Sequence, residues 1–169
     1  MKTIQLILFI VISATAIKKT VADIVFMRSA EKKEISEKAI EIDENNYYYS
    51  LYASKVSISK YHKTKKDKYL SNAVKYLKIA SKYPTDKADI YGILYHLCVI
   101  AKDIKCAGEF VDKAIKLLPN NYVLEYYKGV NEYNKGNLFN AKYWIESSLE
   151  IGRMKGATEL LQKIKDGLK

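Results

Sequence analysis

Few side chains in this sequence have the type and spacing that catalysis needs. The two histidines, His62 and His96, lie 34 residues apart, and no acid stands three or four residues after His96 to orient it as a base. Cys98 stands two residues after His96, which on a helix turns the two side chains about 200° apart and away from a shared metal. There is also no Gly-x-Ser-x-Gly elbow and no glycine-rich phosphate loop. We therefore expect that the protein is not an enzyme and that it holds no metal and no cofactor.

The acidic residues offer no clearer sign of chemistry. Six of them lie between Glu31 and Glu44, where they alternate with Lys32, Lys33 and Lys38. Alternating charge of this kind is typical of a solvated helix face rather than of a general acid and base. The protein is therefore expected to act by binding a partner.

The N-terminus has the three parts of a secretory signal peptide. Lys2 follows Met1, an apolar run covers 6–12, and Ala14-Thr15-Ala16 suits cleavage after Ala16. Cleavage after Ala22 is a second possibility. The apolar stretch over 4–17 is short against the roughly 20 residues that span a bilayer. We expect export to the periplasm or the medium, with an inner-membrane anchor as the alternative.

Two cysteines, Cys98 and Cys106, stand eight residues apart, a spacing that fits no zinc motif. In an exported protein they could form a disulfide. The alternative is that each is a small apolar core residue.

The elements that carry these residues are predicted to be helices. Only 7 glycines and 2 prolines occur in 169 residues, of which 49% are hydrophobic, and this favours a helical chain. An Ala-x6-Ala pattern recurs before each proline and again 34 residues further on, which indicates an internal repeat. The pairs are Ala73 and Ala80 before Pro84, Ala107 and Ala114 before Pro119, and Ala141 with Ser148.

This period of 34 resembles the tetratricopeptide repeat, a helix-turn-helix unit. Residues 88–121 fit the family pattern best, through Leu94, Tyr95, Ala107, Phe110, Val111, Ala114 and Pro119. Residues 122–155 match at Gly129, Gly136, Asn137, Leu138, Ala141, Ile145 and Leu149, and depart at Lys128, Ser148 and Arg153. Trp144 and Gly152 give this last unit some Sel1-like character.

The resemblance implies an all-α fold, a right-handed superhelix or α-solenoid of antiparallel helix pairs. About three units are expected, with an N-terminal helix and a C-terminal capping helix. The expected boundaries are a signal peptide over 1–16 (or 1–22), a helix over 23–46 resembling half a repeat, a unit over 47–87 with an extended turn at 61–68, further units over 88–121 and 122–155, and a cap over 156–169.

In this family the first helices of successive units line a concave groove that binds a peptide or protein partner. The resemblance therefore implies an interaction adaptor or scaffold. Carried onto this sequence, the ligand positions of the first and third units include Tyr48, Lys55, Tyr126, Val130, Tyr133 and Asn134, with Val123 before them. Those of the second unit include Asp89, Gly92 and His96. The alternative is that the tyrosines pack between the repeats.

The net charge of +10 is concentrated in one segment. Nine lysines but only one acid, Asp67, lie between Lys55 and Lys82, a net charge of +8. Such a surface could bind an acidic polymer or an anionic membrane, and the alternative is a solvated basic face. Export and the lack of arginine in this segment disfavour nucleic acid. The candidate patch is Lys60, Lys63, Lys65, Lys66 and Lys68.

Overall fold

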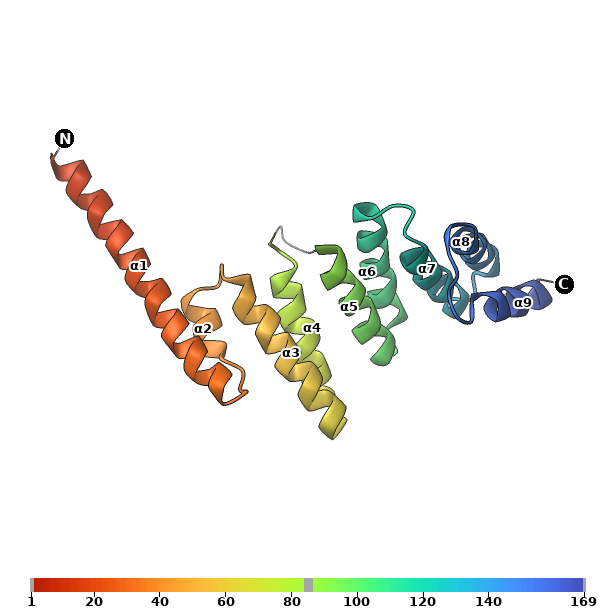
Figure 1. Ribbon diagram of the computed structural model, residues 1–169, viewed down its shortest axis with the longest axis horizontal. Helices are drawn as coiled ribbons and strands as arrows, with labels where there is room; N and C mark the ends of the chain where they lie inside the picture. Colours follow the sequence, from red (N-terminus) through yellow and green to blue (C-terminus); the bar gives the residue numbers. More distant parts are fainter. Residues whose placement is uncertain (1, 84–86, 169) are drawn as a thin grey trace. The chain divides into compact units, whose positions relative to one another are not determined.

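The computed structural model describes residues 2–83 and 87–168, and over these residues the chain forms nine α-helices and no strand (Figure 1). The predicted all-α class is therefore confirmed. The helices divide into two compact units, one ending at Lys82 and the other beginning at Tyr83. Pro84, one of the two prolines that revealed the repeat, lies outside the described residues.

The first unit contains four helices, of which α3 and α4 form the most extensive pair. They are α1 (Lys2–Glu31), α2 (Glu37–Ile42), α3 (Tyr47–Thr64) and α4 (Asp67–Ala80). The single helix expected over 23–46 is instead the end of α1, a loop and the short α2. Lys33 takes a left-handed φ of 53° in that loop. Ser36 then starts α2 by accepting a hydrogen bond from the backbone N–H of Ala39 at 3.2 Å.

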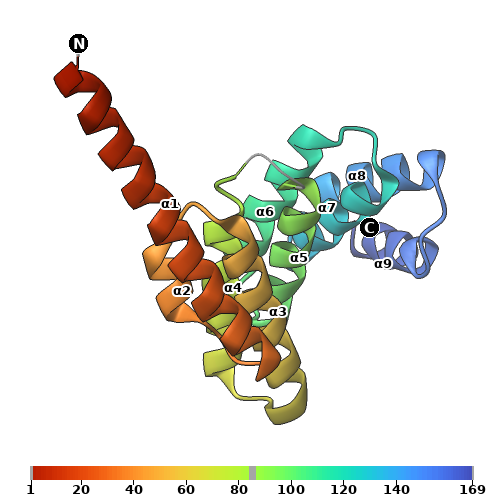
Figure 2. The ribbon, with the colours of Figure 1, turned by 60° about the vertical axis from the view of Figure 1, so that its left-hand side comes forward.

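The second half of α1 packs into the first unit. Ala22, Ala39 and Tyr49 are buried together, with Phe26 against them. Figures 1 and 2 both show the first half of α1 extending beyond α2. Across the described part of the chain, no helix combines the length and the apolarity that a membrane crossing requires.

The extra residues of the first repeat lengthen a helix rather than a turn. Helix α3 has 18 residues, against 14 in α5 and 13 in α7. Only Lys65, with a left-handed φ of 54°, and Lys66 separate α3 from α4. The extended turn expected at 61–68 is therefore the last turn of α3, a two-residue link and the first turn of α4. The four residues by which α3 exceeds α5 are close to one helical turn, so the packing face of α3 keeps its phase.

The second unit contains two helix pairs and a capping helix. These helices are α5 (Lys87–Ile100), α6 (Ile104–Leu117), α7 (Tyr122–Asn134), α8 (Leu138–Ile151) and α9 (Ala157–Gly167). Helix α6 packs on α7, and α9 packs on α8. The apolar stripe of α9 covers the core at the end of the unit. Its Ile164 is fully buried against Ala141 and Ile145.

Asparagines begin the first helix of two repeats. The side chain of Asn46 accepts from the backbone N–H of Tyr48 at 3.2 Å. The side chain of Asn121 accepts from the N–H groups of Val123 and Leu124 at 3.1 and 3.2 Å. Because these bonds satisfy backbone donors that lack a helical partner, they set where α3 and α7 begin.

Small residues set the distance between paired helices. A Cβ placed on Gly129 of α7 would lie 2.5 Å from Cδ1 and 3.2 Å from the backbone nitrogen of Ile145 on α8. Ser148 departs from the alanine that is usual in the family, and its hydroxyl donates to the carbonyl of Tyr122 at 2.7 Å. The serine is therefore fully buried without losing its hydrogen bond.

Candidate functional site

A hollow of about 490 Å³ lies in the second unit between α5 and α7, the first helices of consecutive pairs. Three of the family positions predicted to meet a ligand, Asp89, Gly92 and Val123, line it. We call this hollow the α5–α7 groove, and its lining residues are Ala88, Asp89, Gly92, Ile93, Leu118, Asn121, Val123, Leu124 and Tyr127.

The α5–α7 groove combines exposed apolar side chains with a few polar groups. Ile93 and Leu118 are exposed by 40% and 45% of their surface. Asp89 stands in the first turn of α5 and Asn121 caps α7. A concave, mainly apolar surface with a few fixed polar groups is typical of a binding site.

An aromatic cluster fixes α7 against α5 beside this groove. The rings of Tyr95 and Tyr127 stack at 4.8 Å, and the Tyr95 hydroxyl donates to the carbonyl of Tyr127 at 3.2 Å. His96 meets Tyr127 edge-on at 4.6 Å. Burial raises the pKa of both tyrosines and lowers the pKa of His96, so at neutral pH the cluster carries no charge. The predicted ligand position His96 is thus a neutral side chain at the edge of a packed cluster.

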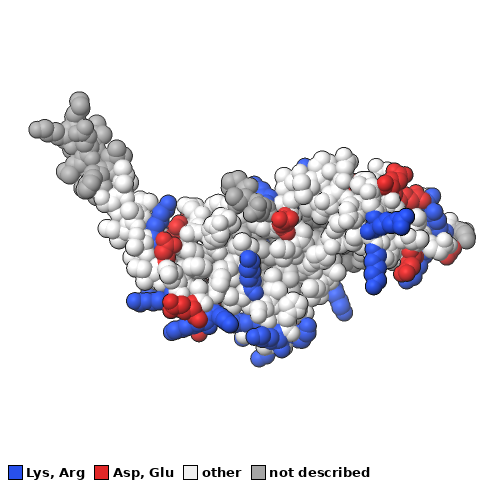
Figure 3. Space-filling view, viewed as in Figure 1, with Lys and Arg blue, Asp and Glu red and all other residues white. Residues whose placement is uncertain are grey.

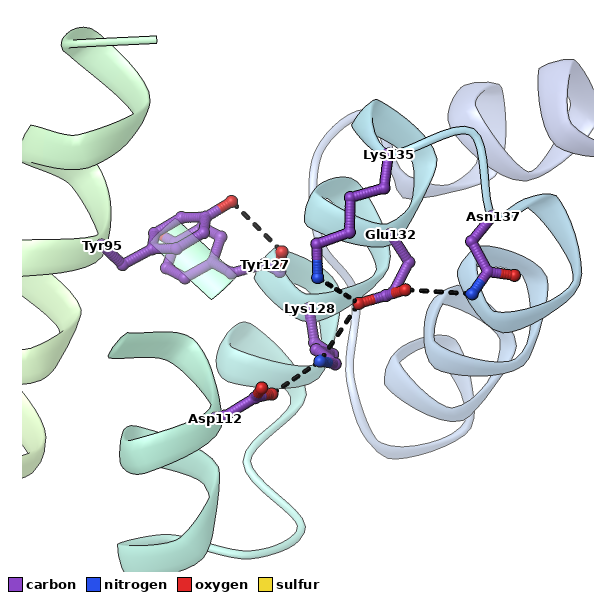
Figure 4. Close-up of polar contacts among 7 residues, drawn as sticks. All are labelled: Tyr95, Asp112, Tyr127, Lys128, Glu132, Lys135 and Asn137. Atoms are coloured by element: carbon purple, nitrogen blue, oxygen red, sulfur yellow. Dashed lines mark hydrogen bonds and ion pairs between the residues drawn. The ribbon is translucent and has the colours of Figure 1, made fainter. Parts of the chain in front are cut away.

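A second set of contacts explains why Lys128 stands where the family usually has an apolar residue. Its Nζ lies 2.6 Å from Asp112 on α6 and 3.1 Å from Glu132 one turn along α7 (Figure 4). Glu132 also accepts from Lys135 at 2.9 Å and from the amide of Asn137 at 3.2 Å. Burial opposes charge on Lys128, but the two carboxylates outweigh it and raise its pKa. Burial also opposes charge on Glu132, but the two ammonium groups hold its pKa below the ordinary value.

The remaining predicted positions on α7 do not line the α5–α7 groove. Tyr126 and Tyr133 are half-buried against the core that α8 and α9 share. Val130 is half-buried and Asn134 is exposed at the end of α7. At Tyr126 and Tyr133 the side chains thus contribute to packing, the alternative that the sequence left open.

A larger hollow, of about 570 Å³, lies in the first unit between α1 and α3. It contains both predicted positions of that unit, Tyr48 and Lys55. Sequence reasoning missed its other wall, because the segment after residue 23 was expected to resemble the second helix of a repeat rather than a first one. Ala22 and Phe26 stand one helical turn apart, and this spacing is the signal that could have identified the face of α1 that packs on α3. We call the hollow the aromatic cavity, lined by Asp23, Phe26, Met27, Asn46, Tyr48, Tyr49, Leu51, Tyr52 and Lys55.

A smaller hollow of about 260 Å³ adjoins the aromatic cavity, because Tyr52 and Lys55 line both. We call it the lysine cleft, lined by Lys33, Tyr52, Lys55, Val56, Ser59, Lys60 and Lys63.

Only two members of the predicted basic patch, Lys60 and Lys63, belong to the lysine cleft. Lys65, Lys66 and Lys68 are exposed around the link from α3 to α4. Basic side chains gather over this end of α3, at the lower edge of Figure 3.

Cys98 and Cys106 form a disulfide with their Cα atoms 5.7 Å apart, which joins the end of α5 to the first turn of α6. No group of three histidine, cysteine or acidic side chains in the described ranges is placed to hold a metal ion.

Comparisons with known proteins give a likeness of structure alone. No protein-family model matches the chain, and no curated protein sequence matches it either. A solved structure similar to the chain is the first tetratricopeptide-repeat domain of Spaghetti (RPAP3), bound to the HSP90 peptide SRMEEVD. The two share 19% identity with a TM-score of 0.57 over 69% of this chain and 93% of that one. Together with the paired helices and the period of 34, this likeness shows that the chain has the tetratricopeptide-repeat fold.

Proposed function

We propose that this chain is an exported interaction adaptor that binds a peptide or protein partner in the α5–α7 groove. The observation that carries the proposal is the placement of Asp89, Gly92 and Val123 around one hollow between consecutive first helices. The similar solved domain holds a peptide, which supports the same class of ligand here. The proposed function is thus binding of a peptide or protein partner.

The chemistry of the α5–α7 groove favours an extended segment with at least one apolar side chain. Ile93 and Leu118 present apolar surface that a partner side chain would remove from water. The neutral cluster of Tyr95, His96 and Tyr127 provides a rigid wall beside it, and rigid aromatic walls lose little entropy when a partner docks.

Substitution of Ile93 tests the groove directly. Once crosslinking from position 93 in intact cells has identified a partner, Ile93→Asp should weaken its binding to the purified chain at least tenfold, because the charge would be buried against the partner. The matched control is Phe139→Asp, which changes an exposed apolar residue on α8. Equal affinity of both variants for the partner would exclude the α5–α7 groove as its site.

Two observations support export, and a third favours one cleavage position. The leader has the parts of a signal peptide, and a disulfide suits an oxidising compartment. Ala22 is buried in the first unit, so cleavage after Ala16 would keep this core intact while cleavage after Ala22 would remove part of it. Cell fractionation with N-terminal sequencing should find Ile17 as the first residue of an exported chain. A chain that keeps Met1 in the cytoplasm would contradict this proposal.

The lysine cleft supports a second candidate function, binding of an acidic polymer or an anionic membrane through the segment 60–68. Four lysines line that cleft, and no acid lines it. Binding by this segment should weaken steeply as the salt concentration rises, because exposed charges are screened. Affinity for anionic vesicles that stays constant from low to high salt would rule out this candidate.

A further inference from the structure

One face of α3 lines two adjoining hollows with opposite chemistry. Tyr48, Tyr52, Lys55, Ser59 and Lys63 follow one another at intervals of three or four residues and therefore form one stripe. The stripe begins in the aromatic cavity and ends in the lysine cleft. A ligand lying along it would meet apolar surface at one end and positive charge at the other.

The aromatic end has rigid apolar walls. Phe26 of α1 stacks on Tyr49 at 4.7 Å and meets Tyr52 edge-on at 5.2 Å. Met27 and Tyr48 complete this end, and each exposes 61% of its surface. Large apolar side chains exposed around one hollow mark a place that an apolar group can fill.

The polar groups at the aromatic end are engaged within the chain. The Tyr49 hydroxyl donates to Asp23, and the Tyr52 hydroxyl donates to the carbonyl of Ala30 at 3.1 Å. The side-chain oxygen of Asn46 caps α3. A peptide backbone buried here would need partners for its own N–H and C=O groups, whereas a hydrocarbon chain needs none. This end therefore favours hydrocarbon over peptide.

The other end gathers positive charge that no carboxylate of a described residue neutralises. Lys33, Lys55, Lys60 and Lys63 line the lysine cleft, and none of them forms an ion pair with a described residue. Like charges that share a cleft repel one another, and an anion placed among them removes this cost. The cleft therefore suits a phosphate group.

The length of the stripe matches a single lipid molecule. The fifteen helical steps from Tyr48 to Lys63 cover about 22 Å, at about 1.5 Å of rise per residue. One leaflet of a bilayer, with its headgroups, is half of about 40–45 Å, hence also about 22 Å. An acyl chain in the aromatic cavity would thus place its headgroup at the lysines.

We propose that the aromatic cavity and the lysine cleft form one binding site for an anionic phospholipid, with an acyl chain between α1 and α3 and the headgroup phosphate among Lys33, Lys55, Lys60 and Lys63. This site lies in the first unit and does not depend on the α5–α7 groove. It would give the protein a lipid ligand in addition to its protein partner.

Calorimetric titration of the purified full-length chain with lysophosphatidylglycerol below its micelle concentration tests the proposal. The double variant Lys60→Gln/Lys63→Gln should bind at least tenfold more weakly. The matched control Lys155→Gln/Lys163→Gln loses the same charge from exposed lysines of the second unit, outside the cleft and outside the segment 60–68, and should stay within about twofold of the unchanged chain. If both double variants bound the lipid equally weakly, the proposed site would be overturned, because the lipid would then be held by general attraction to a basic surface.

The apolar end has its own variant pair on α1. Met27→Asp should weaken binding of the same lipid at least tenfold, whereas Ile24→Asp, on a side chain outside the cavity lining, should change it little. Circular dichroism of each variant shows whether the helices are retained. Unchanged binding by a folded Met27→Asp chain would overturn the placement of the acyl chain.

Two further ligands separate the parts of the lipid. Lysophosphatidylcholine, which has the same chain and no net charge, and glycerol 3-phosphate, which has no chain, should each bind at least tenfold more weakly than lysophosphatidylglycerol. If glycerol 3-phosphate bound as tightly as lysophosphatidylglycerol, the site would recognise phosphate alone and the proposed acyl-chain site would be overturned. An acidic peptide that binds in the same cleft while the lipid does not would overturn the proposal. Neither result bears on a partner held in the α5–α7 groove.

Discussion

The ammonium group of Lys128 on α7 lies 2.6 Å from the carboxylate of Asp112 on α6, and this contact joins consecutive repeats. Lys128 exposes only 13% of its side chain, and it also contacts Glu132, which exposes 8%. A nearly buried charge needs partners, and Figure 4 shows that its neighbours provide them from two helices. The departure from the family pattern at Lys128 is thus matched by acids on α6 and α7.

Removing the Lys128 ammonium should destabilise the protein. Lys128→Ala leaves Glu132 with one fewer ion pair in a nearly buried place, and we expect a loss of about 1–3 kcal/mol in the free energy of unfolding. Urea denaturation measures this loss. The control is Lys165→Ala, because Lys165 and Glu146 are both about half exposed at 3.4 Å and should contribute less than about 1 kcal/mol. Equal losses in both variants would show that the Lys128 contacts add no more than a surface pair.

Acid should weaken the fold through Glu132. The folded state lowers the pKa of this carboxylate, so its stabilising effect is complete above the ordinary value of about 4.5 and declines as the pH falls through the lower, folded value. Denaturation measured from pH 7 to pH 3 should therefore show a smaller acid dependence in Glu132→Gln than in the unchanged chain. Glu150→Gln, which removes an exposed carboxylate on α8, should keep the original dependence. A Glu132→Gln curve parallel to the original would contradict this assignment.

Substitution by alanine should have opposite effects on stability at two helical glycines. Gly129→Ala places a Cβ against Ile145, including its backbone nitrogen, and should cost about 1–3 kcal/mol. Gly92→Ala meets no atom within 4 Å and should stabilise α5 by about 0.5–1 kcal/mol. Thermal unfolding of the two variants should shift in opposite directions. An unchanged or raised unfolding temperature for Gly129→Ala would mean that α7 and α8 are not held at the observed distance.

The disulfide should contribute measurable stability. A bond that closes a loop of eight residues restricts the unfolded chain, and such a loop is worth about 2 kcal/mol. Cys106→Ala should lower the free energy of unfolding by about that amount. A reducing agent should destabilise the unchanged chain to the same extent and should have no effect on the Cys106→Ala variant. Thiol titration of the chain purified without reducing agent should find no free thiol. Two titratable thiols would contradict the bond.

Local sequence was sufficient to predict the repeat and much of its detail. Asn46 and Asn121 begin helices because their side chains satisfy backbone donors in their own neighbourhood. Gly129 opposite Ile145 follows from the demand that two helices approach closely. Each of these features depends on residues within one helix or one helix pair, so local sequence is enough to specify it.

The sequence was less informative wherever a side chain could face either of two neighbours. Tyr126 and Tyr133 occupy family ligand positions, yet they pack against α8 and α9 because the cap brings apolar surface over them. The loop at Lys33 divides the expected helix over 23–46, and this lets α1 become the second wall of the aromatic cavity. Neither outcome has a periodic signal in the sequence.

By itself the sequence determined a helical chain with a period of 34, its caps and its basic segment. Helical phase and capping are local properties, set by the order of neighbouring residues. Only the tertiary structure decided which tyrosines became core, which lysines share a cleft and how Lys128 is compensated. Those outcomes depend on burial and on the distance between charges on different elements, which exist only after the helices have packed.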